Sequence, residues 1–293
     1  MKFNFLGKSE LSVSEVSFGC MSLGTDHTQN ERLLRQAFES GIIFFDTADL
    51  YDKGLNEESA GKALAPIRDQ VIITTKVGNQ WRPDGSGWDW NPTKEYILQA
   101  VEDSLRRLQT ETIDLYQLHG GTVEDPIDEI IGAFELLKEQ GKIREYGISS
   151  IRPNVIREWV KHSNMVSVMM QYSLLDRRPE ESCLDVLNEK SISVITRGSL
   201  AKGLLIDKPA REYLGYPSSD VEKLRKAINK TGEPIASSLG YVLQHPAVAS
   251  AVVGIRTKKQ LDGVISSLKH SVSEEEFSEL ASILKPKVYE KHR

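Results

Sequence analysis

Eight short apolar runs alternate with segments of helical periodicity along almost the whole chain, and this alternation limits the possible folds more than any other feature. Amphipathic stretches such as NERLLRQAFES and IDEIIGAFELLKEQG lie between the runs, and glycines such as Gly41 and Gly141 mark helix ends. The predicted strands are VSFG (16–19), IIFFD (42–46), VIITT (71–75), IDLYQLH (113–119), EYGIS (145–149), VSVMMQ (166–171), ISVIT (192–196) and ASAVVG (249–254).

Eight buried strands alternating with helices over about 250 residues are typical of a (β/α)8 barrel. A doubly wound sheet is the competing α/β fold, but it usually carries a glycine-rich phosphate loop after its first strand. Here the first strand runs into GCMSLGTD, which lacks GxGxxG. The sequence therefore predicts a (β/α)8 TIM barrel.

The N-terminus predicts one addition to the barrel. KFNFL and LSVSEV alternate apolar and polar residues on either side of Gly7–Lys8, which indicates a short β-hairpin. No linker, low-complexity tract or long repeat divides the chain, so residues 1–293 are expected to form a single barrel domain.

Composition excludes several classes of function. The 293 residues have a net charge of −5 with acids and bases interspersed, which argues against a nucleic-acid partner. The two cysteines lack metal spacing, and the six histidines are scattered, so no metal site is expected. No signal peptide or membrane span is predicted, and the expected location is the cytoplasm.

Polar residues follow three consecutive predicted strands. Asp46 ends the second strand, Lys76 the third and His119 the fourth, while Tyr51 lies in the loop after the second. Adjacent strands are about 5 Å apart, so these four side chains are expected to meet at one rim of the barrel. A buried carboxylate needs a cation, and Lys76 is the natural partner of Asp46.

Such a group of four has a definite chemical capacity. A tyrosine hydroxyl ionises near pH 10, and a nearby ammonium is expected to lower that pKa. His119 is placed to hydrogen-bond a substrate carbonyl. The set suits protonation of a carbonyl oxygen as hydride reaches the carbon, and hydride requires a cofactor such as a nicotinamide. Taken singly, each of the four residues also has a purely structural explanation.

The longest stretch without a predicted helix or strand is GNQWRPDGSGWDWNP (78–92), after the third strand. In a barrel this loop emerges at the C-terminal face, where active sites lie. Its tryptophans, Trp81, Trp88 and Trp90, are therefore predicted to bind substrate, and they favour an apolar or aromatic compound. The alternative is a loop whose tryptophans only cover the barrel end.

These motifs resemble the aldo-keto reductases, NADP(H)-dependent barrel enzymes that reduce aldehydes and ketones. The resemblance covers essentially the whole chain. The matching segments, in order, are FFDTADLYDKGLNEESAGKAL (44–64), VIITTKVG (71–78), IDLYQLH (113–119), GKIREYGIS (141–149), QYSLLDR (171–177) and VVGIRTKKQL (252–261).

The resemblance implies a role for each matching position. Tyr51 would be the general acid, with Asp46, Lys76 and His119 around it. Ser149 and Gln171 would bind the nicotinamide carboxamide, residues 197–205 the pyrophosphate and residues 254–260 the adenosine 2′-phosphate. The remaining implied cofactor-binding residues are Ser150, Arg197, Gly198, Ser199, Leu200, Lys202, Gly203, Gly254, Arg256 and Gln260. Arg256 is the expected partner of the 2′-phosphate, which favours NADP(H) over NAD(H).

The chain also departs from the family pattern. Arg197 stands where an aromatic residue often stacks on nicotinamide, and a guanidinium plane can stack in its place. Gly198-Ser199-Leu200 replaces Ser-Pro-Leu, Ser150 replaces an asparagine, and Val264 replaces an asparagine near the adenine. HGGT (119–122) lacks the bulky residue that often follows the histidine, which leaves more room for substrate or only makes a turn.

The leading function is NADPH-dependent reduction of an aldehyde or ketone, with a small-molecule carbonyl compound as partner. A Schiff-base lyase using Lys76 is a second possibility, but Asp46 would keep that lysine protonated. A nucleotide-sensing binding subunit with little turnover is a third. The physiological substrate and the oligomeric state stay open.

Overall fold

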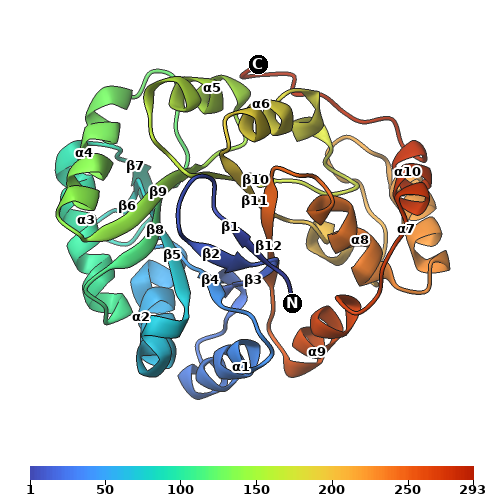
Figure 1. The fold of residues 1–293 in the computed structure, drawn as a ribbon, viewed down its shortest axis with the longest axis horizontal. Helices are drawn as coiled ribbons and strands as arrows, with labels where there is room; N and C mark the ends of the chain where they lie inside the picture. The colour runs from blue at the N-terminus through green and yellow to red at the C-terminus, as the bar shows by residue number, and fades with distance from the viewer.

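A closed barrel of eight parallel strands forms the centre of the computed structural model, which describes residues 1–293 (Figure 1). Around the barrel the strands follow the order β10-β11-β12-β3-β4-β5-β8-β9. Their bounds are β3 Val16–Gly19, β4 Phe44–Asp46, β5 Ile72–Val77, β8 Ile113–Leu118, β9 Ile143–Ser149, β10 Ser167–Gln171, β11 Ser193–Arg197 and β12 Val248–Gly254. Every predicted strand overlaps one of these, so the predicted (β/α)8 barrel is confirmed.

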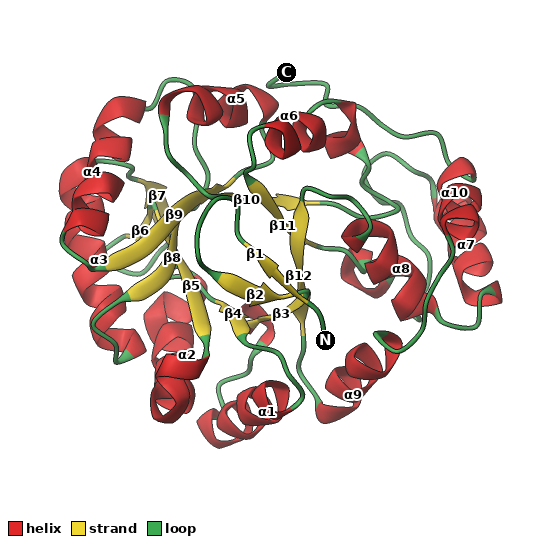
Figure 2. Ribbon diagram, viewed as in Figure 1, coloured by secondary structure: helices red, strands yellow, loops and turns green.

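Helices surround the barrel as an outer layer (Figure 2). Several begin at a side-chain cap that the sequence supplies: Asp26 accepts from the backbone of Gln29, and Thr93 from that of Tyr96. The helices are α1 His27–Glu39, α2 Leu55–Leu64, α3 Lys94–Leu108, α4 Ile127–Glu139, α5 Pro153–His162, α6 Cys183–Glu189, α7 Ser218–Lys230, α8 Pro234–Leu243, α9 Lys258–Ser267 and α10 Glu274–Ser282. None of them is long and apolar enough to cross a membrane.

The N-terminal hairpin is confirmed and covers one end of the barrel. It pairs β1 (Phe3–Phe5) with β2 (Ser12–Ser14) in antiparallel register. Leu6, Leu11 and Val13 are buried against residues of the barrel interior such as Phe44 and Leu115. The hairpin therefore closes the N-terminal end and leaves the C-terminal end for a functional site (Figure 1).

The alternation of side chains along each strand separates two cores. Phe44, Ile72 and Leu115 point into the barrel, whereas their neighbours Phe45, Ile73 and Tyr116 pack outward against the helices. The outer core is the larger, with 66 buried residues against 11 inside, because the helices cover the outward face of every strand. The same alternation decides which strand-end side chains reach the interior.

The prediction of an irregular loop at 78–92 was wrong. Residues β6 Asn79–Trp81 and β7 Trp88–Trp90 form a second antiparallel hairpin, with Trp81 opposite Trp88 and Asn79 opposite Trp90. Arg82 and Asp89 add a bidentate ion pair across it. Aromatic cross-strand pairs favour a β-hairpin. The strands were not predicted because each is only three residues long and the segment between them is rich in turn-forming residues.

Candidate active site

Three strands deliver polar side chains to the interior at the C-terminal rim. Asp46 lies two residues after the inward-facing Phe44 of β4, and Lys76 lies four residues after the inward-facing Ile72 of β5. An even spacing puts each on the inward face of its strand. His119 lies four residues beyond Leu115 of β8 by the same parity. The strand period therefore brings these predicted residues together.

Lys76 is the centre of this group and is almost fully buried. Its Nζ lies 2.6 Å from Asp46 Oδ1 and donates to the carbonyl oxygen of Thr47 at 2.6 Å. Burial is the largest single influence and lowers the pKa of Lys76, but Asp46 and Tyr51 together outweigh it, and the pKa is raised. Lys76 is consequently held as an ammonium. Its ion pair with Asp46 is the one that the sequence predicted.

Tyr51 lies over this ion pair, in the turn η2 (Tyr51–Gly54). Lys76 Nζ is 5.2 Å from the centre of its ring, and the His119 ring meets it edge-on at 5.9 Å. Burial raises the pKa of Tyr51 more than Lys76 lowers it. The expectation of a net lowered pKa was therefore wrong, because the cost of a buried phenolate exceeds the attraction of the ammonium.

His119 completes the group as a neutral imidazole. Burial, followed by the charges of Lys76 and Arg197, lowers the pKa of His119 to about 3. Its Nδ1 is buried without a hydrogen-bond partner in the protein. A neutral imidazole carries one N–H, which can donate a hydrogen bond to an oxygen atom of a ligand.

The turn that carries Tyr51 is strained. Asp52, Lys53 and Gly54 all have positive φ, of 48°, 56° and 89°. Lys53 steadies the turn by donating to the carbonyl of Gly85 and by lying over the Trp81 ring. Consecutive left-handed residues cost free energy, so the surrounding contacts must fix this conformation.

A buried charge cluster behind the turn was missed in the sequence. Glu57 of α2 is fully buried and pairs with Arg107 of α3 at 2.6 Å. It also accepts hydrogen bonds from Thr75 and Ser104. Thr75 precedes Lys76 in β5, and its side chain points outward while that of Lys76 points into the barrel. The cluster therefore supports the strand that carries Lys76. An acidic residue on an otherwise apolar helix face was the available signal.

Two further predicted residues, Gln171 and Arg197, lie at the same rim on neighbouring strands. They stand opposite each other in the register of β10 and β11, and Arg197 Nη1 donates to Gln171 Oε1 at 3.1 Å. Ser149 ends β9 on the inward side, whereas the hydroxyl of Ser150 accepts from the backbone of Arg152 and so serves the local turn.

The segment after β11 forms a tight loop around η5 (Ala201–Gly203). Gly198 and Gly203 have φ of 70° and 91°, and Lys202 is exposed. Ser199 is buried with its hydroxyl 3.0 Å from that of Thr196, and Leu200 packs against the core. Exposed backbone and a lysine in a glycine-containing loop can receive an anion.

The segment after β12 offers a second cationic position. Arg256 and Lys259 are exposed and form no salt bridge within the chain, whereas Lys258 pairs with Asp262 at 2.8 Å. Gln260 accepts from the backbone of Arg256, which shapes the loop. Gly254 lies so close to Ser22 that a Cβ would clash with its hydroxyl.

The three tryptophans occupy different environments. Trp81 donates to the carbonyl of Leu50 at 3.1 Å, next to Tyr51. Trp90 packs against Gly78 and Gly120 and donates to Asp125, which is a structural arrangement. Trp88 is 49% exposed. Trp81 is thus hydrogen-bonded to the segment that carries Tyr51, whereas the hydrogen bond of Trp90 goes elsewhere.

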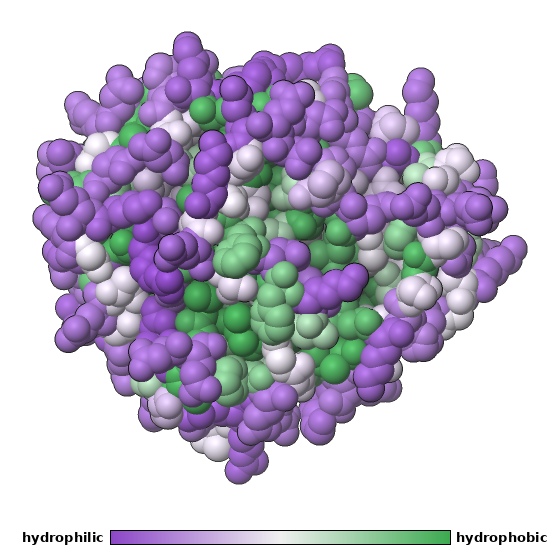
Figure 3. Space-filling view, in the orientation of Figure 1, coloured by the Kyte–Doolittle hydropathy of each residue, from purple (hydrophilic) through white to green (hydrophobic).

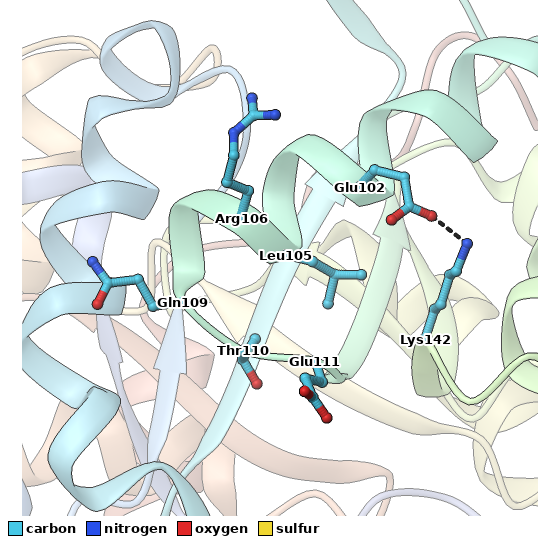
Figure 4. A pocket seen from close by; sticks show the side chains of 7 residues that line it. All are labelled: Glu102, Leu105, Arg106, Gln109, Thr110, Glu111 and Lys142. Carbon is cyan, nitrogen blue, oxygen red and sulfur yellow. Dashed lines mark hydrogen bonds and ion pairs between the residues drawn. The ribbon is translucent and has the colours of Figure 1, made fainter.

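Two clefts, of about 560 and 940 Å³, lie away from this rim. The smaller is lined by residues of α3 and the turn before β8, with Glu102 and Lys142 paired across it (Figure 4). The larger reaches Ser12 of the N-terminal hairpin. On the hairpin face the surface carries apolar side chains among polar ones (Figure 3), and Phe3 and Phe5 are exposed there. The clefts thus lie toward the end opposite the polar rim.

Comparison with known proteins identifies the class of this barrel. Residues 15–285 match the model of the Aldo/keto reductase family. The chain is 49% identical to an uncharacterized oxidoreductase, YqkF, of Bacillus subtilis, over 100% of both chains. It is 32% identical to aldo-keto reductase yakc [NADP(+)] of Schizosaccharomyces pombe, over 82% of this chain and 73% of that protein.

A solved structure agrees with this assignment. Aldo-keto reductase AKR11C1 from Bacillus halodurans, in its holo form, superposes with a TM-score of 0.97 at 49% identity, over 100% of this chain and 99% of the other. Its apo form gives a TM-score of 0.89. The chain belongs to the aldo-keto reductase family and is an oxidoreductase of the kind that acts on carbonyl compounds with a nicotinamide cofactor.

Proposed function

We propose that this protein reduces an aldehyde or ketone to an alcohol with NADPH, and that Tyr51 donates the proton. The observation that carries the proposal is the arrangement of Tyr51, Lys76, Asp46 and His119 at one rim of the barrel. The proposed cofactor-binding residues belong to the ends of β9, β10, β11 and β12 and to the segments that follow them.

The protonation states support these roles. Tyr51 keeps its proton until a strong base forms beside it, because burial raises the pKa of its hydroxyl. As a carbonyl oxygen gains negative charge it becomes such a base, and Tyr51 then transfers the proton. Lys76, oriented by Asp46 at 2.6 Å, stabilises the phenolate that remains.

His119 orients the substrate. Since the pKa of His119 is lowered to about 3, the imidazole is neutral at physiological pH and can hydrogen-bond a carbonyl oxygen. Trp81 lies beside the Tyr51 loop and supplies an apolar wall. Trp88 and Trp90 are the weaker substrate-binding candidates. Trp90 packs against Gly78 and Gly120, and the side chain of Trp88 is largely exposed to solvent.

The residues fit a dinucleotide phosphate. The proposal puts the nicotinamide ring against the amide of Gln171 and the hydroxyl of Ser149, which lie at the ends of the neighbouring strands β10 and β9. A bound nicotinamide would supply the hydride for the carbonyl carbon. Residues 197–205 would hold the pyrophosphate, and exposed Arg256 the 2′-phosphate.

The name of one relative supports this cofactor, because the Schizosaccharomyces pombe protein is called aldo-keto reductase yakc [NADP(+)]. A Schiff-base lyase is disfavoured, because Asp46 keeps Lys76 protonated and an ammonium is no nucleophile. A nucleotide-sensing subunit would share the cofactor site but show negligible turnover.

The first test is titration of the purified protein with NADPH and with NADH, followed by cofactor fluorescence. We expect NADPH to bind more tightly, and Arg256→Ala to weaken it by roughly ten- to a hundredfold, since a charge-assisted contact to phosphate is lost. Lys258→Ala is the matched control, because Lys258 is already paired with Asp262. No binding of either nucleotide would refute the proposal.

The second test removes the proton donor alone. Tyr51→Phe should bind NADPH as the wild type does but lose activity on carbonyl substrates by about 10²- to 10⁴-fold. Turnover in single-wavelength NADPH oxidation assays is the measurement. Full activity in Tyr51→Phe would rule out its assigned role.

A further inference from the structure

The turn of residues 213–216, which lies between η5 and α7, contacts the rim of the barrel through the hydroxyl group of Tyr213. Tyr213 and Tyr216 exchange backbone hydrogen bonds of 3.0 and 2.9 Å, and Leu214 and Gly215 between them have φ of 49° and 77°. Two central residues with positive φ make a tight turn that leucine adopts only at a cost. Such strain is maintained when the surrounding contacts require that conformation.

The two tyrosines of this turn point to different partners. Tyr216 is buried and donates its hydroxyl hydrogen to the carbonyl of Lys285, in the segment after α10. Tyr213 lies near Gln171, with 3.1 Å between its hydroxyl oxygen and Gln171 Nε2. One side chain therefore anchors the turn to the C-terminal segment, and the other contacts a residue at the active-site rim.

The orientation of the Gln171 amide follows from these neighbours. Arg197 has only donors, so the amide atom that faces it at 3.1 Å must be the oxygen. The amide nitrogen must then face Tyr213, whose hydroxyl oxygen accepts from it. Arg197 occupies one lone pair of the amide oxygen and Tyr213 one N–H of the amide nitrogen. One lone pair and one N–H stay free, and this pair is the complement of a carboxamide.

We propose that Tyr213 is a positioning residue that, together with Arg197, holds the Gln171 amide in the orientation that receives the nicotinamide carboxamide. The inference depends on the proposed nicotinamide cofactor. Without the Tyr213 hydroxyl, the Gln171 amide is held only through its oxygen, by Arg197, and its nitrogen loses the partner that fixes the amide plane. A bound carboxamide then meets a less firmly oriented partner. The adenosine end of the cofactor does not depend on this contact.

The test compares two ligands by isothermal titration calorimetry: NADP⁺, and 2′-phospho-ADP-ribose, which lacks the nicotinamide ring. Tyr213→Phe should weaken NADP⁺ by roughly three- to tenfold, the usual effect of one lost hydrogen bond, and leave the affinity for 2′-phospho-ADP-ribose unchanged. Tyr216→Phe is the matched control from the same turn and should leave the ratio of the two affinities at the wild-type value. Circular dichroism spectra verify that both variants fold.

A second variant tests whether Tyr213 acts through Gln171. In a Gln171→Ala background, Tyr213→Phe should cause no further loss of NADP⁺ affinity, because the two residues share one effect. An equal loss for both ligands, no loss for either, or an undiminished loss in the Gln171→Ala background would overturn the inference. If the wild type binds neither ligand, the proposed cofactor fails first and the inference fails with it.

Discussion

Burial acts in opposite senses on the two neutral proton carriers at the rim. It raises the pKa of Tyr51 and lowers the pKa of His119, because a charged form of either side chain is costly away from water. The buried charges of Asp46 and Lys76 compensate each other at 2.6 Å, and Arg197 adds a further positive charge that acts on His119. The site is thus preorganised to respond when charge develops on a substrate oxygen.

The pKa of His119 predicts a pH dependence of stability. The pKa is about 3 in the folded protein and 6.5 ordinarily, so below pH 6.5 the unfolded chain takes up a proton that the folded chain does not. The contribution of neutral His119 to the free energy of unfolding should be fully present above pH 6.5. It should decrease as the pH falls toward 3, by up to about 1.4 kcal/mol per pH unit. Urea unfolding of wild type and His119→Gln at pH 7 and pH 5 measures the difference.

His119→Gln should show a shallower fall in stability between these pH values than the wild type. His162→Gln serves as the control, because His162 lies at the surface of α5, and it should retain the wild-type dependence. Identical pH dependence in wild type and His119→Gln would contradict a neutral, buried His119.

At the scale of the elements, the turn after β4 is the part of the site under most strain. Gly54 has φ of 89°, and a Cβ there would lie 2.8 Å from Cδ of Arg107. Arg107 in turn pairs with buried Glu57. The turn, α2 and α3 therefore share contacts, and a change at Gly54 should reach Tyr51 three residues away.

Gly54→Ala should destabilise the protein by about 1–2 kcal/mol, the cost of a left-handed alanine, and also lower turnover while NADPH binding persists. Gly132→Ala is the comparison, since Gly132 lies within α4 with open space around its Cα. That substitution should stabilise the helix by roughly 0.5–1 kcal/mol and leave turnover unchanged. Thermal melts and NADPH oxidation rates decide between these outcomes, and a harmless Gly54→Ala would contradict the account of the turn.

At the scale of the whole molecule, the barrel is closed by segments far apart in the chain. β12 pairs with β3, joining Val252 to Ser17 and Gly254 to Gly19. The hairpin, the barrel and the helices share apolar contacts, so we expect residues 1–293 to unfold as one domain.

The tryptophans provide a test of this expectation. Trp159 is buried in the helical layer, while the other three lie in the β6–β7 hairpin. In urea, the midpoints of tryptophan fluorescence and of far-UV circular dichroism should coincide. Separate midpoints would show that part of the chain unfolds independently, against a single domain.

Local regularities made much of this protein predictable from its sequence. Strand and helix periodicities depend on near neighbours, so the eight strands and the N-terminal hairpin could be located. The rim residues Asp46, Lys76 and His119 followed from their places at strand ends. Their meeting required only the regular spacing of adjacent barrel strands.

Other features depend on contacts between distant segments, which periodicity does not encode. The tertiary structure alone placed Arg107 against Glu57 and the Tyr213 hydroxyl against Gln171, pairs separated by 50 and 42 positions. It also decided the net direction of the Tyr51 pKa shift, because desolvation depends on everything packed around the ring. The sequence by itself determined the barrel and the order of its chemical groups, whereas packing determined their protonation and orientation.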